Sequence, residues 1–107
     1  MAVADVTPEL LNDIKIYLGI TWQDQTTDQR ISGLAAAGMH YIDSKLGKAA
    51  DYTEVGYPRT LLFEYVRYAR DAALDVFENN YLSMILAMQN EKAVSDYEAL
   101  QNAESEV

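Results

Sequence analysis

Residues 58–100 read PRTLLFEYVRYARDAALDVFENNYLSMILAMQNEKAVSDYEAL, and after Pro58 they contain neither glycine nor proline. Because those two residues interrupt helices most strongly, the stretch favours long helices. The pattern predicts a long third helix from Pro58, with a bend or break at Asn79-Asn80, since asparagine is a mediocre helix former and a good cap. The first half of the stretch carries a heptad-like seam with steps of four and three, formed by Leu62, Val66, Ala69, Ala73 and Val76.

A last helix is predicted from Tyr81 to about Leu100, and its beginning is apolar on almost every side. A helix that is apolar all round must be buried all round. In a chain of 107 residues, one terminal helix cannot easily be surrounded by its own fold. We therefore expect a neighbouring subunit to cover part of it, through an interface that includes Tyr81, Met84, Ile85 and Met88.

The N-terminal part of the chain predicts a first helix over 8–18. Thr7 can cap its free N–H groups, Pro8 suits the first helical position, and Gly19 can end it in a left-handed conformation. A loop is predicted later in the chain, over 48–57, where charges are mixed and apolar residues show no period.

A second helix is predicted to begin near Thr26 or Thr27, because Thr26 and Gln29 fit a capping box, and to end at Gly47. Its middle, AAAG at 35–38, is thin, so we expect another helix to cross closely there. Together the segments predict an all-α fold, a small bundle of three to four helices with a long third helix. The whole chain, 1–107, is expected to form a single domain.

The formal net charge is −9, so the chain repels a phosphate backbone and is not expected to bind DNA or RNA in general. Residues 93–107 form an acidic C-terminal tail without a basic residue. This tail is either a solvated, fraying end or a segment that orders on the basic surface of a partner. No apolar run is long enough to cross a membrane, and no signal peptide is expected. The acidic residues of the tail are Asp96, Glu98, Glu104 and Glu106.

Residue types that carry catalysis or bind metals are sparse. The chain has no cysteine and only one histidine, His40, so a zinc site would need carboxylates as its other protein ligands. No serine lies in a nucleophile-elbow pattern and no glycine-rich phosphate loop exists. We therefore expect no enzymatic activity, no cofactor and no metal. The charged residues Glu64, Arg67, Asp71 and Asp75 are interpreted as an exposed ion-pair ladder along one helix.

Tyrosine is unusually frequent, with eight residues against two phenylalanines. Tyr65, Arg67, Tyr68 and Arg70 lie close together in the sequence, and tyrosine and arginine are both enriched at protein interfaces. We predict an interface role for these four residues. The alternative is a position at the rim of the core, with the tyrosine rings inside and the hydroxyls in water. Arg70 has no acidic residue four positions away on either side and is the better candidate for a partner in another chain.

Two stretches resemble the head–tail connector (adaptor) proteins of tailed phages, in particular those of siphophages. The first is DIKIYLGI at 13–20 followed by DQRI at 28–31 and the alanine-rich helix through Tyr41-Ile42. The second is YVRYARDAALDVFENNY at 65–81, which is similar to the long-helix region of the siphophage members. The order, the spacing and the total length support the resemblance together, over about residues 7–100.

The resemblance implies a structural role in the virion, at the head–tail joint, after assembly in the cytoplasm of the bacterial host. Such adaptors dock beneath the portal protein as a ring, extend the DNA exit channel and offer a platform for the stopper or tail-completion protein. It implies about twelve copies in a closed ring. DNA would be only a passing cargo, and an acidic lining would repel it where a basic lining would hold it.

A second interpretation belongs to a different class of protein. A small acidic helical regulatory or binding module, such as an antitoxin-like or anti-repressor-like dimer, would account for the charge and the helices without a ring. The mass of the particle in solution separates a ring from a dimer.

Overall fold

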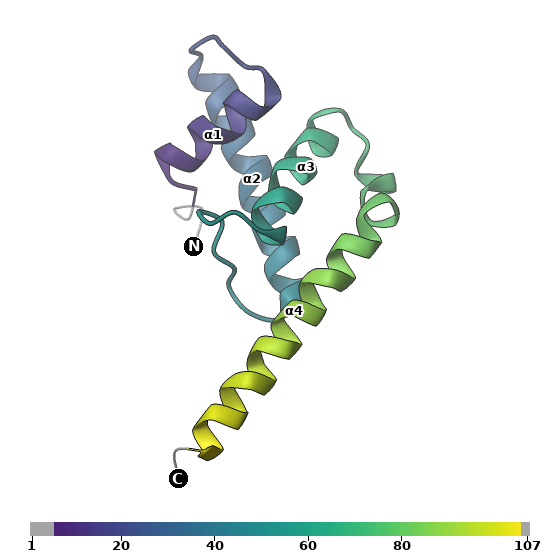
Figure 1. Ribbon diagram of the computed structural model, residues 1–107. Coiled ribbons are helices and arrows are strands. Elements are labelled where there is room, and N and C mark those ends of the chain that lie inside the picture. The colour runs from purple at the N-terminus through teal and green to yellow at the C-terminus, as the bar shows by residue number, and fades with distance from the viewer. Residues whose placement is uncertain (1–5, 106–107) are drawn as a thin grey trace.

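The structure, a computed structural model, describes residues 6–105. The regular secondary structure within these residues is entirely helical, with four α-helices and no strand, which confirms the predicted all-α class (Figure 1). Glu106 of the predicted acidic tail lies outside the described residues. The elements are α1 (Pro8–Leu18), α2 (Gln25–Leu46), α3 (Tyr57–Arg70), the single-turn 3-10 helix η2 (Leu74–Val76) and α4 (Phe77–Ser105).

The ends of α1 follow the sequence signals. Thr7 Oγ1 accepts a hydrogen bond from the backbone N–H of Leu10 at 3.1 Å, and Gly19 ends the helix with a φ of 77°. The start of α2 differs from the prediction. Asp24 caps it by accepting hydrogen bonds from both the backbone N–H and the hydroxyl of Thr27, at 2.9 and 2.8 Å. The predicted capping box of Thr26 and Gln29 is therefore wrong, because an aspartate two residues earlier caps the helix.

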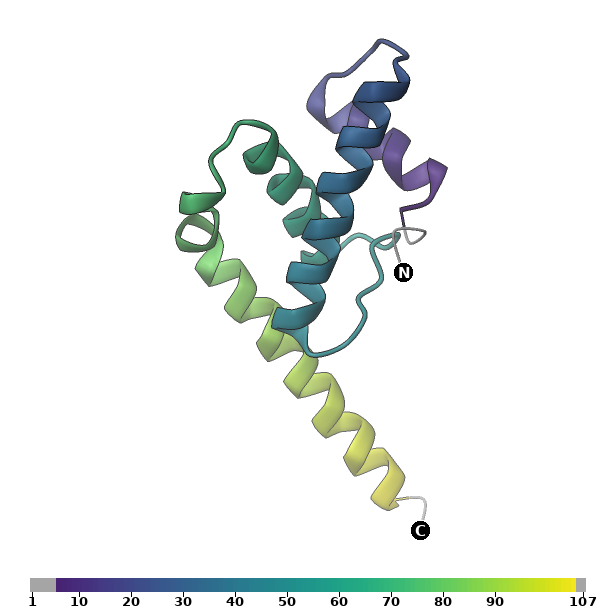
Figure 2. The ribbon, with the colours of Figure 1, turned by 180° about the vertical axis from the view of Figure 1, so that it is seen from behind.

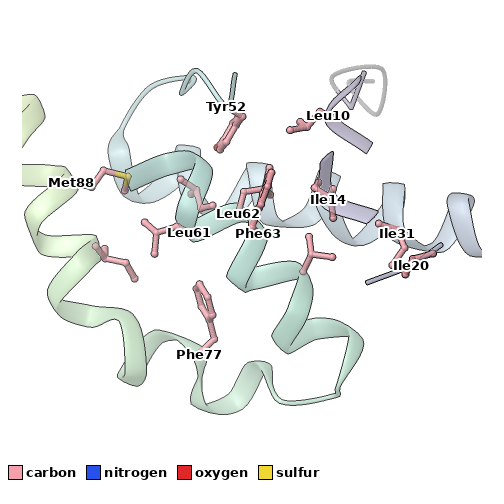
Figure 3. Packing of buried hydrophobic residues seen from close by; sticks show 14 residues of the cluster. Leu10, Ile14, Ile20, Ile31, Tyr52, Leu61, Leu62, Phe63, Phe77 and Met88 are labelled. Atoms are coloured by element: carbon pink, nitrogen blue, oxygen red, sulfur yellow. The ribbon is translucent and has the colours of Figure 1, made fainter. Parts of the chain in front are cut away.

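The core forms where α2 crosses α3. Figure 3 shows Leu61 and Leu62 of α3 among the buried side chains, and both are fully buried. Gly38 of α2 makes this crossing close, because a Cβ at its position would lie 2.8 Å from Cδ1 of Tyr65 and 2.9 Å from Cδ1 of Leu62. The tight crossing expected at residues 35–38 is confirmed.

Two glycine substitutions in α2 should therefore have opposite effects. Gly38→Ala should lower the free energy of unfolding by about 1 kcal/mol, since overpacking outweighs the gain in helix propensity. Gly33→Ala should raise it by about 0.5–1 kcal/mol, because nothing lies within 4 Å of a Cβ there. Urea unfolding followed by circular dichroism measures both. Equal stabilisation by the two substitutions would contradict the close crossing.

The predicted long third helix is wrong, because α3 ends at Arg70 and the chain turns before α4 begins. Ala72 adopts a left-handed conformation with a φ of 57°, at a cost of about 1–2 kcal/mol. The turn brings Phe77 back into the core, where 2% of it is exposed and where it touches four tyrosine rings. Figure 3 shows Phe77 pointing from the start of α4 toward Leu61. Burial of a phenylalanine gives about 1.5–3 kcal/mol, and ring contacts add to it.

The break predicted at Asn79-Asn80 does not occur, because α4 runs through both residues without interruption. Both side chains are exposed, and Asn80 donates a hydrogen bond to the hydroxyl of Tyr68 at 3.1 Å. Asparagine costs a helix only about 0.5 kcal/mol, which is too little to break it. The long helix is thus the fourth and not the third. The predicted heptad-like seam also ends early, since Val76 is 42% exposed.

The two halves of α4 have different surroundings. Its first half packs against α2 and α3, where Gln89 donates a hydrogen bond to the carbonyl of Lys45, at the end of α2, at 2.8 Å. Its second half projects away from the other helices (Figures 1 and 2). Every side chain described from 93 to 103 is exposed. We call residues 93–105 the arm, and its length is about 20 Å at 1.5 Å per residue.

Candidate interaction surfaces

A buried carboxylate joins three helices. Glu64 of α3 is 6% exposed and accepts hydrogen bonds from the hydroxyls of Tyr17 in α1 and Tyr81 in α4. The guanidinium of Arg67 binds the same carboxylate, with Nη2 2.5 Å from Oε1. The exposed ion-pair ladder predicted for this helix is therefore wrong for Glu64. Among residues 6–105, the Glu64–Arg67 pair forms but no ion pair joins Arg67 to Asp71.

The electrostatics of this group keep Glu64 ionised and the tyrosines protonated. The Arg67 guanidinium, helped by the two hydroxyls, lowers the pKa of Glu64 to about 2 against the opposing effect of burial. Burial and the hydrogen bond to Glu64 raise the pKa of Tyr81 to about 12. The hydrogen bond to Glu64 likewise raises the pKa of Tyr17. Donors from three helices surround this carboxylate, so it acts as a clamp between the helices.

Glu64→Gln should lower the free energy of unfolding at neutral pH by about 1–3 kcal/mol, because it removes a charge-assisted set of hydrogen bonds. The folded-state pKa of Glu64 lies below its ordinary value of 4.5, so ionised Glu64 stabilises the fold above that pH. That contribution is lost as the pH falls from 4.5 to about 2. Urea unfolding across this range should show the variant and the natural chain converging at the acid end.

The control is Glu98→Gln, which removes an exposed carboxylate from α4. It should leave the free energy of unfolding at neutral pH within about 0.5 kcal/mol of the natural chain. If the difference in the free energy of unfolding between Glu64→Gln and the natural chain stayed constant down to the acid end, that result would show that ionised Glu64 does not stabilise the fold.

The tyrosines predicted at an interface surround Phe77. The centroid of the Phe77 ring lies 5.4 Å from that of Tyr65, 5.6 Å from that of Tyr68 and 5.1 Å from that of Tyr81. Their rings are half-buried, as the rim-of-core alternative describes. This aromatic cluster joins α3 to α4. The high tyrosine count thus has a role inside the subunit.

Two of the predicted interface residues are core residues. Ile85 is 3% exposed and Met88 is 2% exposed, and both belong to the hydrophobic core of their own chain. The expectation that a neighbouring subunit must cover them is wrong, because the turn at Ala72 lays this face of α4 against α2 and α3. Met84 is half-buried against the same core. The side chain of Arg70 makes no hydrogen bond or ion pair within residues 6–105, and its interface role stays a prediction.

The opposite face of α4 carries the exposed apolar side chains that sequence reasoning did not single out. Leu82, Leu86, Tyr97 and Leu100 are 45%, 54%, 61% and 58% exposed. With the exposed Ala93 between them, these five residues form the outer stripe. Steps of four, seven, four and three along the sequence are the signal that could have revealed it. The helix is apolar on both sides, as predicted, but its own chain covers only the inner side.

Within residues 6–105, no group of three or more histidine, cysteine, aspartate or glutamate side chains could hold a metal ion. In the same part of the chain, no helix combines the length and apolar character needed to cross a membrane. The chain matches no protein-family model, no curated protein and no solved structure. The likeness to head–tail connectors stays a prediction from the sequence.

Proposed function

We propose that this chain is a structural protein without enzymatic activity, a head–tail connector of a tailed phage. Copies of it dock beneath the portal as a ring, extend the DNA exit channel and present a platform to the stopper or tail-completion protein. About twelve copies close the ring. The observation that carries the proposal is the outer stripe, an apolar surface on a projecting helix that its own fold leaves in water.

An assembly role follows from the energetics of that surface. Full burial of a leucine side chain contributes about 1.5–3 kcal/mol. The large side chains of the stripe are about half exposed, so covering them gains part of this and favours association. Contiguous exposed apolar side chains on a soluble protein mark interaction sites more often than scattered ones do. The stripe lies on a rigid helix, which reduces the entropy lost when a partner binds.

The charge suits a channel through which DNA passes. The chain carries a net charge of −9, and Asp96 and Glu98 of the arm are exposed. Acidic side chains that face the lumen of a ring would repel the phosphate backbone and let it slide. This lining is part of the proposal. An assembled ring with its acidic residues turned outward would exclude it.

The proposal is tested by adding the purified chain to purified portal rings of its phage. Native mass spectrometry and negative-stain images should show about a dozen copies bound as one ring on each portal. A chain that ignores portal rings at every concentration would contradict the connector role. If a chain that ignores portal rings also formed a dimer, the antitoxin-like or anti-repressor-like alternative would replace the connector role.

Two neighbouring residues separate assembly from folding. Ile85→Asp places a charge in the core and should lower the free energy of unfolding by at least about 3 kcal/mol. Leu86→Asp places the same charge on the outer stripe and should change it by only about 0.5 kcal/mol, yet abolish assembly on the portal. Urea unfolding and portal binding are measured for both. If the Leu86→Asp variant assembled normally on the portal, the outer stripe would not be part of the assembly surface.

A further inference from the structure

The outer stripe is narrow and open to a second helix. At 100° per residue, its five residues fall within about 60° of the helix circumference. The inner face, which carries Ile85 and Met88, points well away from it, so the body of the subunit does not cover the stripe. Figures 1 and 2 show the arm standing clear of the other helices. A helix of similar length could therefore lie along the stripe from Leu82 to Leu100.

Charge is distributed unequally along α4. Residues 79–90 contain no charged side chain, whereas residues 93–105 contain acidic residues at 96, 98 and 104 and no basic one. Two copies of α4 packed in parallel would place one acidic arm beside the other. Two antiparallel copies would place each acidic arm beside the uncharged half of its partner, and would also oppose the helix dipoles favourably.

The apolar positions match in the antiparallel arrangement as well. When Leu82 of one copy lies opposite Leu100 of the second copy, Leu86 comes within one residue of the position opposite Tyr97. Because the pair has two-fold symmetry, the same contacts recur at the other end. Between them, Ala93 lies opposite Gln89 and Asn90 and lets the backbones approach closely. We infer that two free copies of this chain pair through the outer stripes of α4, with their helices antiparallel.

The area of the stripe sets the strength of this pairing. Each of its four large side chains is about half exposed and can bury on the order of 100 Å². Two copies together bury about 800 Å² in this way, less than the roughly 1,200 Å² of a standard stable interface. The pair is therefore weak and reversible, and the net charge of −9 on each copy weakens it further at low salt. Such a pair shields the stripe in the free protein.

This pairing concerns the free chain and does not depend on the connector role. Sedimentation equilibrium of the full-length chain, over a wide range of concentration, should show monomers and dimers in exchange, with more dimer as the salt concentration rises. Leu100→Glu should raise the dissociation constant at least about tenfold. A chain that stays monomeric throughout, or that forms only larger species, would overturn the pairing.

Val94→Glu is the matched control. Val94 is 49% exposed on the same arm but lies about a quarter-turn from the middle of the stripe. This variant adds the same charge, so it should leave the dissociation constant within about twofold of the natural value. Equal weakening by both variants would show that charge alone, and not the stripe, controls association.

Disulfide trapping tests the orientation, and the natural chain contains no cysteine that could interfere. Leu82→Cys and Leu100→Cys proteins are prepared separately and oxidised, either alone or mixed. Antiparallel pairing predicts that the mixture forms a disulfide between the two different variants, whereas each variant alone remains largely reduced. Efficient homodimer formation by each variant alone would indicate parallel helices and overturn the inference.

Discussion

The burial of Phe77 determines where the longest helix of the molecule runs. Its ring sits among four tyrosine rings, and the contacts outweigh the cost of the left-handed Ala72 that lets the chain turn back. Without this turn, α3 and α4 would form one rod, and Ile85 and Met88 would lose their place in the core. The exposed position of the outer stripe is a consequence of the same turn, because one face of α4 can be covered only if the other faces away.

The carboxylate of Glu64 complements this apolar contact. Packing of the Phe77 ring among other rings keeps the helices together but allows them some rotation. The hydrogen bonds of Glu64 with Tyr17, Arg67 and Tyr81 are directional, so they fix the orientation of the helices. The three partners lie on three helices, so the orientation of α4 is coupled to that of α1 through a single side chain. Apolar burial provides most of the stabilisation, and the buried carboxylate makes the arrangement specific.

Local signals in the sequence were sufficient at several helix ends that depend on their immediate neighbours, although not at the start of α2. Thr7, Gly19 and Gly47 mark such ends, and the small Gly38 marks the crossing of α2 and α3. The break at Ala72 left no such signal, because alanine is the best helix former and the gain comes from rings elsewhere in the chain. For the same reason, sequence spacing could not tell whether the covered face of α4 held Ile85 or its neighbour Leu86.

The end of α4 lies far from the turn at Ala72, so a small rotation at the turn moves that end a long way. The helix has 29 residues, so its far end lies about 44 Å from its start. A rotation of about ten degrees at the turn would displace that end by about 8 Å, more than one helical pitch. Alanine at position 72 restricts such rotation more than glycine would, because it has fewer accessible backbone conformations. Because the turn at Ala72 is rigid, the packing of a few rings around Phe77 determines accurately where the far end of α4 lies.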